Sequence, residues 1–311
     1  MTKQRLQMDG IITVLNTPFT NAGTIDLPGL GKNAALAMDA GVAGFLVPAL
    51  ASEVGKLTED ERDSLVAEVV RRTAGRVPVI GGATAPTREA RCAATRRLTA
   101  LGCAGILVNI PFESEGQYAD EVRAVADMGP HFLMLQDWDP SGHGLPLELI
   151  SRLFREVDCF RCLKIEVVPA GVKYSAVLEA TGGALHVSGG WAVTQMIEAL
   201  DRGVHAIMPT GMHSVYTRIF ALHRAGSRKE ARELFHRLLP VLAFSNQHLD
   251  ISIHFFKRLL HRQGVCATPM VRPPILPFDA AHERVADELI KHALALMAEC
   301  DAAEEARGRV N

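Results

Sequence analysis

The sequence predicts an α/β fold, a (β/α)8 TIM barrel followed by a C-terminal appendage of three helices. Short apolar segments alternate eight times with helical segments over about the first 225 residues, which indicates a closed barrel. The apolar segments are continuous Val/Ile/Leu runs, which is typical of parallel strands covered on their outer face. Beyond Gly226 the strand pattern stops and only helical periodicity follows.

The predicted strands are short apolar runs that end in small or polar residues. In chain order they span residues 11–16, 44–48, 77–81, 105–109, 132–136, 163–167, 185–188 and 205–208. The predicted barrel helices lie between and after these strands, and local signals mark some of their ends. Thr58 followed by Glu61 is a capping box that opens a helix, and Gly102 suits the position just past a helix end. These helices span residues 27–40, 58–74, 87–101, 115–127, 146–156, 173–179, 193–201 and 212–225.

Three amphipathic segments follow the predicted barrel, at residues 227–244, 249–262 and 280–299. A proline-rich stretch at residues 269–277 joins the last two. We therefore expect a catalytic barrel over residues 1–225 and a helical region over residues 226–311.

Charge and hydropathy exclude several classes of partner. Lys and Arg total 33 against 35 for Asp and Glu, so the net charge of −2 gives no electrostatic case for a nucleic-acid or membrane partner. The first ten residues contain no apolar stretch typical of a signal peptide, and no later run approaches the ~18 residues of a membrane span. We expect a cytoplasmic protein that acts on a small molecule.

The cysteines and histidines do not indicate a metal or another cofactor. Six cysteines in 311 residues do not resemble a disulfide framework, and we expect reduced structural thiols. Cys159 and Cys162 match C-x-x-C, but no second pair is present for zinc. The twelve histidines show no metal-ligand spacing, and no phosphate-loop motif occurs.

Lys164 interrupts the apolar sixth strand and is the first candidate for a catalytic residue. A buried ammonium group is costly unless it is paired or neutral, and burial lowers a lysine pKa by up to ~3–5 units. A neutral amine attacks a ketone and forms a Schiff base. The alternative is a lysine that extends to water or pairs with a carboxylate. Glu166 shares its strand face and would pair with Lys164 or move protons for it.

The active site of such a barrel lies at the C-terminal ends of its strands. These ends carry small and polar residues, among them Ala51-Ser52, Gln136-Asp137, Gly189-Gly190-Trp191 and Thr210-Gly211. The glycines permit close approach of a ligand, or serve tight turns, and the pattern favours neither.

Four motifs carry a resemblance to a known family. They are Thr17-Pro18-Phe19, Ser52-Glu53 with residues 57–62, Lys164, and Arg272-Pro273-Pro274. Over almost the whole chain they resemble the dihydrodipicolinate synthase/N-acetylneuraminate lyase family. Within it the sequence is most similar to the 2-keto-3-deoxyarabonate dehydratase type, which shares Gln136-Asp137, Lys164-Ile165-Glu166 and Gly189-Gly190-Trp191.

The resemblance implies a class I mechanism in which Lys164 condenses with the ketone of a 2-oxo acid. The iminium then withdraws electrons from C3, so that elimination or carbon–carbon cleavage follows. It also implies that groups near Ala51 and Ser52 bind the substrate carboxylate. Further implied substrate contacts are Gln136, Asp137, Gly189, Trp191 and Thr210. The family's usual assembly implies a homotetramer built as a dimer of dimers.

Phe112 is the most consequential departure from the family pattern, because it stands where the strand-4 loop usually carries a proton-relaying tyrosine. A phenyl ring carries no proton. The three tyrosines of the chain lie within predicted helices, and Tyr118 matches a family tyrosine that looks structural. The relay would therefore fall to Glu166, Asp137, Glu113 or a bound water.

Two further departures disfavour synthesis of dihydrodipicolinate. Leu50 and Ala51 replace two threonines of the synthases, and Gln136-Asp137 replaces a Tyr-Asn pair. Two functional interpretations remain. The first is a lyase that acts on a 2-oxo acid, in particular a 2-keto-3-deoxy sugar acid. The second is an impaired relative that binds a 2-oxo acid or a protein partner without turnover.

Overall fold

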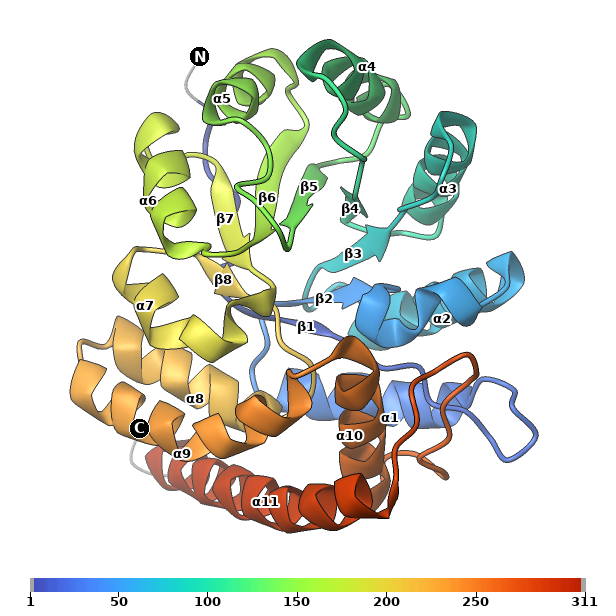
Figure 1. Cartoon of the computed structure of the whole chain (residues 1–311), viewed down its shortest axis with the longest axis vertical. Coiled ribbons are helices and arrows are strands. Elements are labelled where there is room, and N and C mark those ends of the chain that lie inside the picture. Colours follow the sequence, from blue (N-terminus) through green and yellow to red (C-terminus); the bar gives the residue numbers. More distant parts are fainter. Residues whose placement is uncertain (1–2, 309–311) are drawn as a thin grey trace.

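A computed structural model describes residues 3–308, without the side chains of residues 191, 192, 307 and 308, and confirms the predicted barrel. Its strands are parallel and pair in sequence order, and the last strand closes on the first. Figure 1 shows the helices arranged around the outside of this barrel. The strands are β1 (Gly10–Val14), β2 (Gly44–Val47), β3 (Val79–Gly82), β4 (Gly105–Val108), β5 (Leu133–Asp139), β6 (Phe160–Val167), β7 (His186–Gly189) and β8 (Ala206–Ile207).

The barrel helices follow the strands as predicted, with small differences at their ends. They are α1 (Leu27–Asp39), α2 (Glu59–Thr73), α3 (Arg88–Ala100), α4 (Glu115–Ala126), α5 (Leu147–Glu156), α6 (Gly171–Ala180), α7 (Met196–Asp201) and α8 (His213–Arg224). Three short 3-10 helices were not predicted: η1 (Leu50–Ser52), η2 (Val54–Lys56) and η3 (Trp191–Gln195). The predicted helix over residues 193–201 therefore begins as η3, and the fifth strand continues beyond its predicted end to Asp139.

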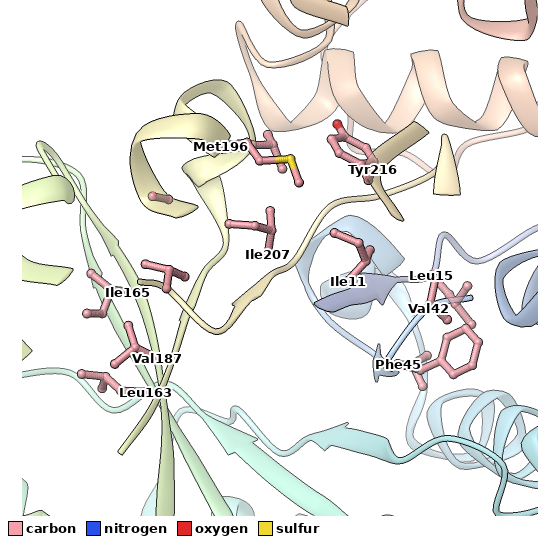
Figure 2. Packing of buried hydrophobic residues seen from close by; sticks show 14 of the residues in the cluster. Ile11, Leu15, Val42, Phe45, Leu163, Ile165, Val187, Met196, Ile207 and Tyr216 are labelled. Carbon is pink, nitrogen blue, oxygen red and sulfur yellow. The ribbon is translucent and has the colours of Figure 1, made fainter. Parts of the chain in front are cut away.

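Side chains that alternate along the strands form two hydrophobic cores. One core fills the barrel interior and includes Ile12, Leu46 and Cys162. The other lies between the strands and the surrounding helices. Figure 2 shows part of it, where Leu163 and Ile165 of β6 lie near Val187 of β7. From Cys162 on, odd-numbered side chains of β6 therefore face the surrounding helices, whereas even-numbered ones face the barrel interior. The interior core, which includes Cys162, lies beneath the next even-numbered residues, Lys164 and Glu166.

The C-terminal helices are α9 (Arg228–Ser245), α10 (Leu249–Arg262) and α11 (Ala280–Gly308), and α11 extends beyond its predicted end. Figure 1 shows α9 and α11 along the outer side of α8, where both helices pack against it, while α10 packs against η1. The turn between α9 and α10 thus returns to the C-terminal ends of the strands. Whether residues 226–311 form a separate unit stays a prediction. Within residues 3–308, the helices are all too short or too polar to cross a membrane.

Candidate active site

A cavity of about 840 Å³ lies at the C-terminal ends of the barrel strands. Lys164 and Glu166 line it from β6, and Gln136 lines it from β5. Ala51 and Thr210, two of the predicted substrate contacts, also line it. The cavity thus lies at the C-terminal ends of the strands, where the sequence predicts the active site.

Lys164 is buried, with 6% of its surface exposed, and its Nζ lies 2.9 Å from Glu166 Oε2. The same Oε2 accepts a hydrogen bond from Gln136 Nε2. Gln136 is opposite Lys164 in the register of β5 and β6, so neighbouring strands bring these groups together. The pairing of Lys164 with Glu166, expected from the period of two along a strand, is present. A lysine amine and a carboxylate thus adjoin one cavity.

Gly190 makes room for this pair. A Cβ built on Gly190 would lie 2.0 Å from Glu166 Oε1 and 2.5 Å from Lys164 Cε. The side-chain direction alternates along β7 and the residue after it, which explains why Gly190 faces Lys164 whereas Gly189 does not line the cavity. Gly190, and not the predicted contact Gly189, is therefore the glycine that lines the cavity after β7.

Replacing Gly190 with alanine is expected to lower turnover by about 10²-fold, because the methyl group must displace Lys164 and Glu166, and small misplacements of reacting groups cost rates of this order. The measurement is steady-state turnover together with thermal unfolding. Gly116→Ala in α4 is the matched control, since its Cβ would meet no atom within 4 Å. Equal activity of the two variants would contradict the packing argument.

Two of the predicted contacts, Ser52 and Asp137, do not line the cavity. The Ser52 hydroxyl donates to Leu15 O at 2.6 Å and accepts from Ala49 N at 3.1 Å, so it holds the loop after β2 instead of facing a ligand. Asp137 points to the outer face of β5, because Gln136 before it points inward. Its carboxylate pairs with Lys173 Nζ at 2.6 Å and accepts from Leu145 N at 2.8 Å. Burial nevertheless raises the pKa of Asp137 above its ordinary value.

Phe112 follows β4 and is 44% exposed, with its ring centroid 6.0 Å from that of Tyr118. Its neighbour Pro111 lines the cavity, whereas Phe112 does not. Tyr118 is buried within α4, which agrees with the structural role that the sequence suggested for it. Trp191 begins η3, but its side chain lies outside the described part of the structure.

Sequence reasoning missed the side of the cavity that the C-terminal region forms. Asn246, His248 and Ser252 line it from the α9–α10 turn and the start of α10. Tyr216 of α8 lines it as well, and burial raises the pKa of this phenol, so that it stays a proton donor. No local motif marks these residues, because only the return of the chain over the barrel brings them to the strand ends.

A comparison with known families shows that residues 7–293 match the model of the dihydrodipicolinate synthetase family. The chain belongs to the dihydrodipicolinate synthetase family. It is accordingly an enzyme of the lyase class, and the predicted resemblance is confirmed.

Two relatives of this chain in the dihydrodipicolinate synthetase family carry different enzyme names, a synthase and a dehydratase. A 4-hydroxy-tetrahydrodipicolinate synthase of Xanthomonas campestris pv. campestris is 29% identical over 300 residues, covering 94% of this chain and 97% of the relative. An L-2-keto-3-deoxyarabonate dehydratase of Azospirillum brasilense is 27% identical over 276 residues, covering 86% of this chain and 88% of the relative. Such similar identities do not select one substrate.

Solved structures support the fold. The dihydrodipicolinate synthase of Rhodopseudomonas palustris superposes with a TM-score of 0.85 at 20% identity, covering 93% of this chain and 99% of that one. That of Thermotoga maritima gives a TM-score of 0.85 at 19% identity, covering 94% and 100%. The closed barrel with its C-terminal helices is thus the fold of the family.

Proposed function

We propose that this protein is a lyase that forms a Schiff base between Lys164 and the ketone of a 2-oxo acid, in particular a 2-keto-3-deoxy sugar acid. The observation that carries the proposal is a buried lysine amine that lines the cavity 2.9 Å from a carboxylate. Addition of the amine to the carbonyl carbon and loss of water give an iminium, which is an electron sink for the bonds at C3.

Glu166 is the proposed proton carrier of this reaction. As a carboxylate it would remove a proton from C3 of the iminium, which gives an enamine. In a dehydration the enamine electrons expel the C4 hydroxyl, which leaves as water with the proton that Glu166 returns. In an aldol cleavage, Glu166 would instead take the proton of the C4 hydroxyl while the C3–C4 bond breaks. Both outcomes use the same two residues.

The loop after β2 is the proposed binding site of the substrate carboxylate. The N–H groups of Ser52 and Glu53 donate to Ala49 O and Leu50 O within η1. The N–H groups of Leu50 and Ala51 open this turn, and none of the described backbone carbonyls accepts from them. Leu50 and Ala51 line the cavity, so their N–H groups are suited to a carboxylate.

A sugar-derived substrate is supported by the dehydratase relative and by polar side chains around the cavity, including Gln136, Thr210 and Ser252. Leu50 and Ala51 favour it over dihydrodipicolinate synthesis, because they replace threonines of the synthases. Assembly as a homotetramer stays a prediction that rests on the family alone.

Borohydride reduction in the presence of pyruvate tests the proposal, since it converts an iminium into a stable secondary amine. Peptide mapping by mass spectrometry is expected to find the adduct on Lys164 and on no other lysine. Lys164→Arg should abolish the adduct while the thermal unfolding curve stays that of a folded barrel, because a guanidinium keeps the charge but is not an amine nucleophile. If neither pyruvate nor a longer 2-keto-3-deoxy acid labels Lys164, the Schiff-base mechanism is wrong.

A further inference from the structure

Arg62 lies at the edge of the active-site cavity, and among residues 3–308 no group pairs with its side chain. It lies in the first turns of α2 and lines the cavity. Its side chain makes no hydrogen bond or ion pair with any residue in the described range 3–308, and its Nε is buried. A buried guanidinium nitrogen without an acceptor is costly, so a missing partner is a meaningful feature of this site.

The acidic residues around Arg62 are already engaged by other arginines. Arg97 of α3 pairs with Glu59 and with Asp63, the latter at 2.8 Å. Arg272 pairs with Glu61, and this contact lowers the pKa of Glu61 to about 2. The carboxylates that could neutralise Arg62 from its own helix thus have other partners. Arg62 lines the active-site cavity and also a smaller pocket of about 150 Å³, which it shares with Glu59, Asp63 and Arg97.

Arg62 and Lys164 lie on opposite walls of the cavity. Arg62 belongs to the helix that follows β2, whereas Lys164 is on β6, and in the closed order β1–β8 these strands are diametrically opposed. A molecule that contacts both groups must therefore span the cavity. Its volume of about 840 Å³ is far more than a three-carbon 2-oxo acid fills.

We propose that Arg62 binds a second carboxylate, at the end of the 2-oxo acid remote from the ketone that reacts with Lys164. This inference rests on the proposed function and narrows its substrate class to 2-oxo dicarboxylic acids, which include deoxy sugar diacids. A guanidinium matches a carboxylate through two parallel hydrogen bonds. A doubly charged phosphate fits less well, because Glu59, Glu61 and Asp63 adjoin Arg62 in the sequence, whereas the other arginines of α2 lie in its last turn.

Matched pairs of ligands test this inference on the full chain. 2-Oxoadipate and 2-oxopimelate carry the second carboxylate, whereas 2-oxohexanoate and 2-oxoheptanoate have the same lengths without it. Isothermal titration calorimetry is expected to show about ten- to a hundredfold tighter binding of at least one diacid than of its matched monoacid. Arg62→Gln should bring this ratio close to one, and Arg62→Lys should give an intermediate ratio, because an ammonium offers charge without the planar fork.

Arg71→Gln is the matched control, since Arg71 lies on the same helix but pairs with Glu68 on the surface. This variant should keep the diacid preference of the wild type. A ratio near one in the wild type, or a preference that survives Arg62→Gln, would overturn the inference. Calorimetry does not require covalent capture, whereas labelling of Lys164 by pyruvate and borohydride does. A failure of the Schiff-base proposal is therefore distinguishable from a failure of the role of Arg62.

Discussion

Replacing Glu166 with glutamine is expected to lower turnover by about 10²–10⁴-fold while capture of a 2-oxo acid on Lys164 persists. The amide has the shape of the carboxylate and can still bond to Gln136, but it cannot take up a proton. Turnover and borohydride labelling, measured on the same preparation, separate proton relay from Schiff-base formation.

Glu179→Gln is the control for this experiment, because Glu179 is exposed on α6, the helix after β6. It should leave both measurements unchanged. Full activity of Glu166→Gln would assign the relay to another group that lines the cavity. A wild-type enzyme that forms the adduct but turns over no 2-keto-3-deoxy acid would support the alternative interpretation, an impaired relative that binds without turnover.

The pH dependence of the wild type addresses the same point, since Phe112 cannot relay protons. If a carboxylate relays the proton, the pH–rate profile of turnover should follow a group that titrates below about pH 7. A tyrosine would ordinarily titrate near ~10. Tyr216 lines the cavity, but its burial raises its pKa and so makes it a donor.

The fold was predictable because its signals are local and repeat along the chain. Helical and strand periodicity, together with caps such as Thr58, determine each unit, and parallel strands with short connections close in only a few ways. The Lys164–Glu166 pair was predictable for the same reason, because the period of two along one strand places both side chains on one face.

The predicted contacts and the residues that line the cavity differ where the facing of a strand residue, or the return of the C-terminal chain, determines which side chains reach the cavity. Asp137 and Gly189 each adjoin a residue that faces the cavity, and alternation turns them away from it. Ser52 has a residue type suited to a ligand, but a backbone group of its own loop and the carbonyl of Leu15, just after β1, occupy its hydroxyl. Arg62 could not be identified from sequence as unpaired, since its neighbouring carboxylates are engaged by Arg97 and Arg272, which lie far away in the chain.

Replacing Glu53 with glutamine is expected to lower the free energy of unfolding by about 3–5 kcal/mol, the usual cost of breaking a buried ion pair. Glu53 follows η1 with a left-handed φ of 57°, and its side chain is fully buried. It pairs with Lys257 of α10 and with Lys56 at 3.1 Å, and it accepts from Arg272 N at 3.0 Å. One carboxylate thus joins the loop after β2 to the C-terminal region, and its loss leaves Lys257 buried without its partner.

Urea unfolding measures this loss, and Glu156→Gln is the control, because that exposed pair with Arg123 should be worth only about 0–1 kcal/mol. Burial lowers the pKa of Lys257 to about 8. Between pH 8 and about 10.4 the unfolded chain therefore binds more protons at this site, so the site favours folding increasingly as pH rises. A neutral amine needs no carboxylate, and the cost of Glu53→Gln should be smaller at pH 9 than at pH 7. A cost below 1 kcal/mol at pH 7, or one that grows with pH, would show that Lys257 does not depend on Glu53.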